Sequence, residues 1–380
     1  MNKRSFFLSC FILAFLIVLI SLSTAMALLT ISSIQTEIKT TFGEPSPSLA
    51  ESQKLWFQLL LYANKEKLTT PLNTQAQPQT FLITPNEPTP TILTRLAQEG
   101  FISDPQILQI LMQYLGYDTQ IQTGEHFLSA RMSPHQIAKA LIDPANLLIQ
   151  FDLLAGWRKE EVSTALVASG LNFTVQEFLE AATQPLDLYL PQRSLASITS
   201  LEGFLMPASY RLLKNATPED LLRLFTQNFG AQVSTEIDQQ FQQQGLSFYE
   251  GIILASIVQR ESVLEDEMPL IASVFLNRLR AQMKLDSDAT VQYALGYNDI
   301  QKTWWTNPLS TADLTIDSPY NTYLYPGLPP TPICNPSLAA ILAVANAPPS
   351  DYLYFRAACD GSGRHIFAKT YPEHLENACP

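Results

Sequence analysis

Residues 247–262 read S-F-Y-E-G-I-I-L-A-S-I-V-Q-R-E-S. Ser247 and Glu250 form an S-x-x-E capping box, which predicts that a helix begins here. The apolar residues that follow recur at spacings of three and four, as on one buried face of a helix. Glu261 lies one turn further along that face. The stretch therefore places a carboxyl group at the end of an apolar stripe.

The position of Glu261 favours acid catalysis. Burial disfavours the charged form of a carboxyl group, so we expect the pKa of Glu261 to be raised. A carboxylic acid that stays protonated near neutral pH can donate a proton to a leaving oxygen, as cleavage of a glycosidic bond requires. The alternative is a solvated glutamate, or one paired with the adjacent Arg260, and helical spacing alone does not decide between them.

The 380-residue chain is acidic and rich in apolar residues. Hydrophobic residues make up 46% of the sequence, which is enough for a large core in two or three domains. Charged residues make up 15%, and the formal net charge is −12. Binding of nucleic acid requires clustered lysine and arginine to neutralise phosphates. The sequence has no such cluster, so we expect no nucleic-acid partner.

An apolar segment follows two basic residues near the N-terminus. Residues 1–5, the expected cytoplasmic tail, include Lys3 and Arg4, and residues 6–29 carry no charge. A run of this length can cross a bilayer, and the preceding positive charge predicts a cytoplasmic N-terminus. We therefore expect a single-pass anchor in the cell (inner) membrane, with the rest of the chain outside. A cleaved signal peptide is the alternative, because residues 25–27 (A-M-A) fit a cleavage site.

The remainder of the chain shows an α+β pattern. We expect a juxtamembrane helix and linker over 30–79, which ends in a polar, proline-containing stretch without periodicity. From residue 80, short strands and capped helices alternate, and this predicts a small α+β region over 80–195. It resembles the LysM-like modules that hold glycan chains, and a plain α+β spacer is the alternative. A mixed α/β catalytic domain is expected over 196–380.

A second predicted helix also ends in polar residues. Asn277 and Arg278 occupy positions at which its two apolar stripes would continue. Together with Glu261, they suggest that two helix ends meet at a polar pocket. The alternative is that Asn277 caps the neighbouring chain and that Arg278 is solvated.

Three later segments supply further polar and aromatic side chains. Residues 286–290 (D-S-D-A-T) form a predicted loop and helix cap, for which capping is favoured over cation binding. Prolines hold residues 318–336 extended, and the tyrosines and asparagine there suit the C–H faces and hydroxyl groups of sugars. The alternative is that these tyrosines pack on the core. A predicted hairpin over 352–369 carries His365, the histidine that we place nearest to the chemistry.

Glu202 is an acidic residue in the otherwise apolar segment 201–210. It is either a second carboxylate of the active site or a buried hydrogen-bond anchor, and we favour the structural role. The sequence contains no H-E-x-x-H motif or paired Cys/His spacing, so we expect no metal and no cofactor. Three cysteines lie outside the apolar segment, and Cys359 with Cys379 is the favoured disulfide pair.

Several blocks, in this order and spacing, together resemble one family, the endolytic murein transglycosylases (YceG-like lytic transglycosylases). The resemblance is specific over about 200–370 and weaker over about 80–200. The blocks are L-E-G-F-L-M-P-A-S-Y at 201–210, L-A-S-I-V-Q-R-E-S at 254–262, P-L-I-A-S-V-F-L-N-R-L at 269–279, M-K-L-D-S-D-A-T-V-Q-Y-A-L-G at 283–296, S-P-Y-N-T-Y…G-L-P-P-T-P-I at 318–333, D-Y-L-Y-F at 351–355 and H-I-F-A-K-T at 365–370.

The resemblance implies a membrane-anchored enzyme with a LysM-like region. It implies cleavage of the MurNAc-β-1,4-GlcNAc bond within nascent peptidoglycan strands, without water, to leave a 1,6-anhydro-MurNAc end. The family's catalytic glutamate corresponds to Glu261, and Glu202 and Asn277 also match family positions. The chain departs from the pattern at Gln259, two residues before Glu261, where another acid is common. It also departs at two loop positions. These loop residues are Ala289, in place of a usual proline, and Thr331, in place of a usual glycine.

From the residues and the resemblance together, we expect Glu261 to act alone as general acid and then base, while the substrate's C6 hydroxyl attacks C1. A hydrolytic muramidase and a non-catalytic peptidoglycan-binding adaptor are the alternatives. The expected partners are peptidoglycan strands, the cell membrane and, through the family alone, peptidoglycan synthases. The side chains expected to bind substrate are Asn277, Asp288, Thr290, Tyr320, Asn321, Tyr323 and His365.

Overall fold

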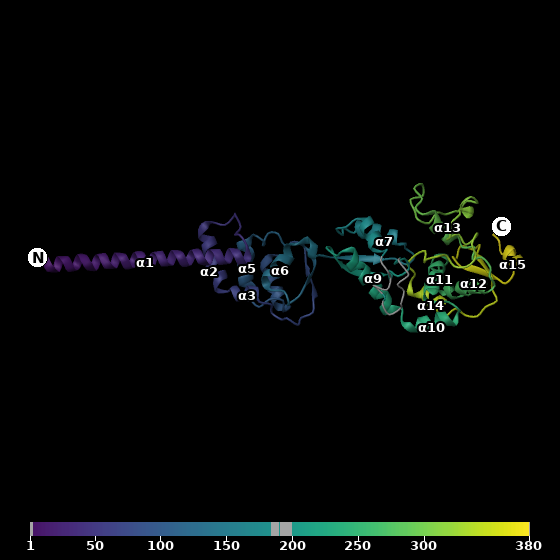
Figure 1. Ribbon diagram of the computed structural model, residues 1–380, viewed down its shortest axis with the longest axis horizontal. Coiled ribbons are helices and arrows are strands. Elements are labelled where there is room, and N and C mark those ends of the chain that lie inside the picture. Colours follow the sequence, from purple (N-terminus) through teal and green to yellow (C-terminus); the bar gives the residue numbers. More distant parts are fainter. Residues whose placement is uncertain (1–2, 184–189, 191–199, 380) are drawn as a thin grey trace. The chain divides into compact units, whose positions relative to one another are not determined.

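A computed structural model describes residues 3–183, 190 and 200–379 of the chain (Figure 1). The chain divides into two compact units, Met1–Ile149 and Gln150–Pro380. Both combine helices with short two-stranded sheets, which confirms the expected α+β composition. The predicted boundary at residues 195–196 falls outside the described residues. Residues 150–182, which the sequence pattern placed in the LysM-like region, are grouped with the second unit.

The N-terminal helix α1 spans Lys3–Phe42. Its stretch Leu16–Phe42 is long and apolar enough to cross a membrane, which fits the predicted single-pass anchor and would equally fit a signal sequence. Apolar side chains in this stretch are exposed, as at Leu28, which is 67% exposed. The helix continues beyond the predicted end of the anchor, and Ile38 and Phe42 are buried in the core of the first unit.

In the first unit, short helices pack around a two-stranded sheet. Strands β1 and β2 pair antiparallel, so that Phe81 lies opposite His126. The alternation of strands and helices predicted from residue 80 is confirmed here, while the likeness to a LysM-like module stays a prediction. The elements are α2 (Glu51–Ala63), α3 (Lys65–Thr69), β1 (Gln79–Ile83), α4 (Thr89–Gln98), α5 (Pro105–Leu115), β2 (Gly124–Leu128), α6 (Pro134–Ile142) and the 3₁₀ turn η1 (Pro144–Asn146).

The second unit is built around α11 (Phe248–Glu261), which packs against α14 (Leu338–Ala345) and α12 (Met268–Arg280). The predicted capping box is present, since the Ser247 amide donates to Glu250 Oε2 at 2.7 Å. Residues 251–258 are all buried, so the helix is enclosed on every side rather than on the one face predicted. The reason is that α10 (Thr235–Gln243) also packs on it.

The other elements of the second unit surround this centre. Strand β3 (Leu148–Leu153) pairs with β4 (Ala208–Leu213). The remaining helices are α7 (Lys159–Ala168), α8 (Val175–Ala181), α9 (Pro218–Gln232), α13 (Asp288–Leu295) and α15 (Tyr371–Glu376), with the 3₁₀ turns η4 (Glu265–Glu267) and η5 (Asp313–Thr315).

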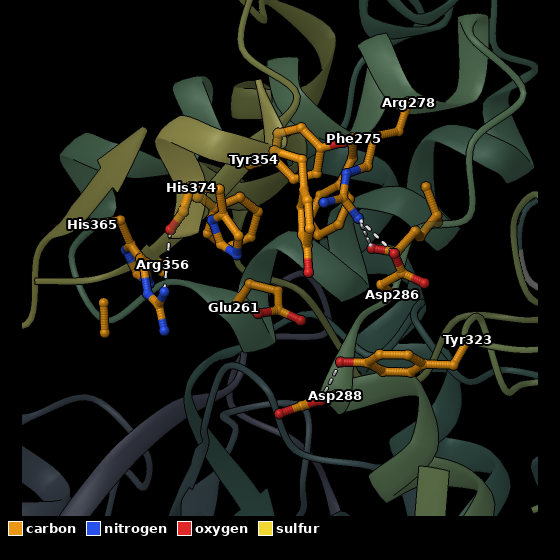
Figure 2. A pocket seen from close by; sticks show the side chains of 14 residues that line it. Glu261, Phe275, Arg278, Asp286, Asp288, Tyr323, Tyr354, Arg356, His365 and His374 are labelled. Atoms are coloured by element: carbon orange, nitrogen blue, oxygen red, sulfur yellow. Dashed lines mark hydrogen bonds and ion pairs between the residues drawn. The ribbon is translucent and has the colours of Figure 1, made fainter. Parts of the chain in front are cut away.

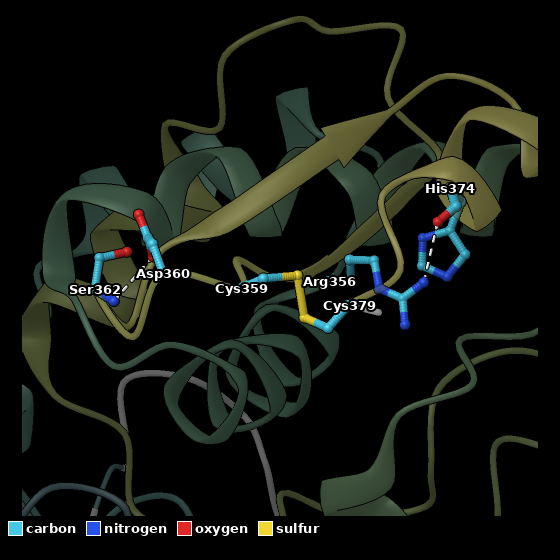
Figure 3. The surroundings of a disulfide bond; sticks show 6 residues. All are labelled: Arg356, Cys359, Asp360, Ser362, His374 and Cys379. Atoms are coloured by element: carbon cyan, nitrogen blue, oxygen red, sulfur yellow. Dashed lines mark hydrogen bonds between the residues drawn. A yellow bond between two sulfur atoms is a disulfide. The ribbon is translucent and has the colours of Figure 1, made fainter.

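The C-terminal segment is a hairpin followed by a tethered helix. Strand β5 (Tyr354–Ala357) pairs antiparallel with β6 (His365–Ala368), which confirms the predicted hairpin. A disulfide joins Cys359, just after β5, to Cys379, just after α15, and this confirms the favoured pair (Figure 3). The bridge therefore holds α15 close to the end of β5.

Candidate active site

Glu261 is the last residue of α11 and lines a cavity of about 490 Å³ in the second unit (Figure 2). Three further parts of the chain complete the wall. They are the end of α12, the segment around the start of α13 with Tyr323, and the hairpin with α15. The cavity thus collects side chains from segments separated by up to about a hundred positions in the sequence.

The environment of Glu261 favours its protonated form. The Ser287 hydroxyl donates a hydrogen bond to Glu261 Oε1. This bond and a backbone hydrogen bond from Ala289 favour the carboxylate, but burial outweighs them and the pKa of Glu261 is raised. The expected rise is therefore confirmed. Arg260 does not form the alternative ion pair, because its guanidinium lies over the Trp305 ring, 3.7 Å from the ring centroid.

A buried network holds Ser287 in place. The Ser287 amide donates to Thr322 Oγ1 at 3.1 Å, and the Thr290 hydroxyl donates to the Ser287 carbonyl at 2.7 Å. The two threonine hydroxyls also share a hydrogen bond of 2.8 Å. Thr290 is fully buried and is absent from the cavity lining. Thr290 therefore supports Ser287, the hydrogen-bond partner of Glu261, and does not itself line the cavity.

Two of the predicted substrate-binding residues meet at the cavity. The Tyr323 hydroxyl donates to Asp288 Oδ1 at 2.8 Å, and both side chains line the cavity with Glu261. Burial and then the hydrogen bond to Asp288 raise the pKa of Tyr323. Asp286 lies in the same wall, so the cavity contains carboxyl groups besides Glu261.

The end of α12 contributes one residue to the cavity and one to its support. Arg278 lines the cavity and is only 8% exposed, so it is not solvated. Its guanidinium donates to the carbonyl of Leu353 at 2.6 Å and to that of Leu285 at 2.8 Å. Asn277 instead donates to the carbonyl of Ser350 at 2.8 Å. This contact matches the alternative prediction, in which Asn277 caps a neighbouring segment of the chain. Of the two, Arg278 reaches the polar pocket.

The hairpin and α15 form the remaining wall. His365 lines the cavity, and its Nδ1 lies 3.1 Å from Glu267 Oε2, which orients the imidazole. Sequence reasoning missed Tyr354, Arg356 and His374, which also line the cavity. The available signal for Tyr354 was its place in the block at 351–355, while Arg356 and His374 had none.

Two other predicted substrate-binding residues hold the extended loop. Asn321 is fully buried and donates to the carbonyls of Leu314 at 3.0 Å and Ile316 at 2.9 Å. The Tyr320 hydroxyl shares a hydrogen bond of 2.8 Å with that of Thr331. Neither side chain is part of the cavity lining, and contact of either with substrate stays a prediction.

Glu202 occupies a separate buried position. It is fully buried, and both of its carboxyl oxygens accept a hydrogen bond from the Lys159 amide, at 3.0 and 3.2 Å. Asn335 Nδ2 donates to the same carboxyl group at 3.3 Å. Burial raises the pKa of Glu202 to about 8. These contacts describe an anchor for the start of α7 rather than a lining group of the cavity.

Two further observations concern the predicted chemistry of the site. Gln259 replaces the additional acid of the family pattern, and its Oε1 accepts a hydrogen bond from the Ser337 amide at 2.9 Å, which places it at the start of α14. Within the part of the chain that the structure describes, no group of three or more His, Cys, Asp or Glu side chains is arranged to hold a metal ion.

Comparisons with known proteins agree on one family. The model of the YceG-like family matches residues 81–379. An endolytic murein transglycosylase of Bacillus subtilis is 35% identical over 175 residues, which are 46% of this chain and 46% of that protein. An endolytic murein transglycosylase of Streptococcus pneumoniae is 28% identical over 313 residues, which are 75% of this chain and 55% of that protein. The chain therefore spans about half the length of the curated relatives it matches.

A solved structure shows the same fold. The crystal structure of a yceG-like protein from Listeria monocytogenes matches with a TM-score of 0.53 and 27% sequence identity. The match covers 80% of this chain and 99% of that chain.

Proposed function

We propose, from the premise that this chain belongs to the YceG-like family, that it is a lytic transglycosylase that cuts peptidoglycan strands with Glu261 as general acid and base. The environment of Glu261 carries this proposal, because a carboxyl group of raised pKa lines a cavity in which a strand can bind. The relatives in Bacillus subtilis and Streptococcus pneumoniae, named endolytic murein transglycosylases, support the choice of substrate.

The proposed reaction needs one carboxyl group. Protonated Glu261 gives its proton to the oxygen of a MurNAc-β-1,4-GlcNAc bond, and the bond from that oxygen to C1 of MurNAc breaks. The C6 hydroxyl of the same MurNAc then attacks C1, and its proton passes to the Glu261 carboxylate. The strand ends in 1,6-anhydro-MurNAc, no water is consumed, and Glu261 is protonated again.

The neighbours of Glu261 suit this sequence of steps. The hydrogen bond from Ser287 to Oε1 orients the Glu261 carboxyl group in the wall of the cavity. Asp288 lies in the same cavity and, when ionised, stabilises the positive charge that develops on the sugar ring. Tyr323 fixes the orientation of Asp288 through its 2.8 Å hydrogen bond.

A hydrolytic muramidase is the second candidate, and one observation favours it. Glycoside hydrolysis uses two carboxyl groups, and the cavity holds Asp286 and Asp288 in addition to Glu261. In this reaction one of these aspartates would activate water or attack C1. The products differ, since hydrolysis leaves reducing ends whereas transglycosylation leaves anhydro ends.

We further infer that α1 anchors the chain in the cell membrane with its N-terminus in the cytoplasm, and that the first unit holds glycan as a LysM-like module. The continuity of α1 supports this inference, because the helix runs from the apolar segment into the core of the first unit, where Ile38 and Phe42 are buried. A glycan-binding unit held in this way would meet strands as they are made. Termination of nascent strands beside peptidoglycan synthases is the corresponding physiological proposal.

Digestion of purified sacculi by the full-length Glu261→Gln protein tests the reaction. Loss of the acid and base should lower the release of anhydro-muropeptides by about 10²- to 10⁴-fold, as measured by mass spectrometry. Glu265→Gln, which changes an exposed acid of η4, is the matched control. Unchanged release from the Glu261→Gln protein would rule out the assignment. Reducing ends would favour the muramidase, and glycan binding without new ends would favour a non-catalytic adaptor.

A further inference from the structure

Arg356 brings a positive charge to the wall of the Glu261 cavity (Figure 2). Its Nη1 donates to the backbone carbonyl of His374 at 3.2 Å. Among the residues that the structure describes, no carboxylate pairs with this guanidinium. Other arginines of this acidic chain do have such partners, as in Arg95 with Glu87 at 2.8 Å. An unpaired guanidinium beside a reactive carboxyl group indicates a site for an anionic group of the ligand.

The groups around Arg356 leave its charge available. Arg278, the other arginine of the cavity, is already bonded to the carbonyls of Leu353 and Leu285. His374 Nδ1 is buried and has no hydrogen-bond partner in the described ranges of the chain. Burial, then Arg356 and then Arg278 lower the pKa of His374, so its imidazole is neutral at neutral pH. The carboxyl groups of the cavity lie elsewhere in its wall, and Figure 2 shows Glu261 between Arg356 and Asp286.

The disulfide makes this part of the wall rigid. Cys359 follows Arg356 by three positions, and its partner Cys379 follows α15, which carries His374 (Figure 3). The bridge thus holds Arg356 and the carbonyl that it contacts in one geometry before any ligand binds. A preorganised guanidinium loses less conformational entropy on binding than a mobile one.

We propose that Arg356 binds a free carboxylate of the peptide that branches from muramic acid, so that the cavity prefers strands whose stem peptides carry this carboxylate to strands whose peptides are neutral. This inference rests on the proposed function. In a peptide-bearing strand the lactyl carboxyl group of muramic acid is bound in an amide, so the sugars are uncharged and the free carboxylates lie on the stem peptide. An anion site in the wall that also holds Glu261 therefore matches the peptide beside the cleaved bond and not the sugar.

Two substrates separate recognition of the peptide from cleavage of the sugar. Strands with stem peptides, and the same strands after their peptide carboxylates have been converted to carboxamides, are digested by the full chain in detergent micelles. Loss of a charge-assisted pair in Arg356→Gln should lower kcat/KM on strands with free peptide carboxylates by about 10- to 100-fold. The ratio of the two rates should fall with it, and Arg356→Lys, which keeps the charge but not the fork of donors, should restore part of the ratio.

The matched control is Arg223→Gln, which removes a charge from an exposed position on α9 and should leave the ratio unchanged. Binding of a peptide-bearing disaccharide, with its peptide carboxylates free or converted to carboxamides, to the Glu261→Gln protein is measured by calorimetry and does not depend on cleavage. Tighter binding of the form with free carboxylates that disappears in the Glu261→Gln, Arg356→Gln protein supports the site, even if the wild-type chain releases no anhydro ends. Equal affinities for the two ligands, or a difference that persists without Arg356, would overturn the inference.

Discussion

Replacing Glu202 by glutamine should abolish a pH dependence of stability that this buried carboxyl group imposes on the second unit. Burial, and then the charge of Glu160, raise the pKa of Glu202 to about 8. In the unfolded chain a glutamate titrates near its ordinary value of about 4.3. Between these values the folded protein holds a proton that the unfolded chain has released. The free energy of unfolding therefore falls as the pH rises through this window and levels off above pH 8.

The size of the effect follows from the two pKa values. A difference of one pKa unit corresponds to about 1.4 kcal/mol, so the wild-type chain should lose at most about 5 kcal/mol between about pH 4 and about pH 8. Glutamine has nearly the same shape and does not titrate. Its side-chain oxygen can still accept the hydrogen bond from the Lys159 amide, which is 3.0 Å from Glu202 Oε1 in the wild type. The Glu202→Gln protein should therefore be the more stable of the two at about pH 8.5.

Urea unfolding of the full-length proteins in micelles measures this difference. The unfolding is followed by tryptophan fluorescence between about pH 5 and about pH 9. Three of the four tryptophans, Trp157, Trp304 and Trp305, lie in the second unit, so its transition can be fitted separately from that of the first. Parallel pH profiles for the two proteins would refute the reasoning. If Glu202 is an anchor, the variant should also keep its activity on sacculi, and a folded but inactive variant would instead identify a second catalytic carboxylate.

Two further substitutions test the surroundings of Glu261. Ser287→Ala removes a hydrogen bond that lowers the pKa of Glu261, so this pKa should rise further. In a pH–rate profile, the loss of activity at alkaline pH should therefore move to higher pH. An unmoved profile would contradict this role of Ser287. Replacing Cys359 and Cys379 together by serine opens a loop of 20 residues and should cost the second unit about 3 kcal/mol of stability in denaturant unfolding. It should also raise KM more than it lowers kcat, because α15 forms part of the cavity wall, and an unchanged KM would show that α15 docks without the bridge.

Local signals were sufficient for the helix that carries Glu261. Its capping box lies within four residues, and its apolar spacing within fourteen, so neither depends on how the rest of the chain folds. The raised pKa of Glu261 was also predictable, because a carboxyl group at the end of an apolar stripe is desolvated by the same packing that forms the core. The hairpin followed from a similarly short-range pattern, whereas Cys359 and Cys379 were the favoured pair because they bracket the C-terminal segment.

The partners of Glu261 depended on contacts between distant positions. Ser287 is 26 positions away, and Arg356 reaches the cavity from a hairpin that follows α14. No periodicity or cap connects such segments, because their approach is set by the packing of α11, α12 and α14.

Residue type alone also left open which groups a polar side chain contacts. Thr290 and Asn321 are of types that suit sugar hydroxyls, yet both are fully buried and bonded to the backbone of their own chain. Tyr323 and Asp288, of no more distinctive type, line the cavity. The sequence by itself determined which hydrogen bonds these side chains can make. Only the tertiary structure decided whether the partner is the protein or open space for a ligand, since burial depends on every segment that packs nearby.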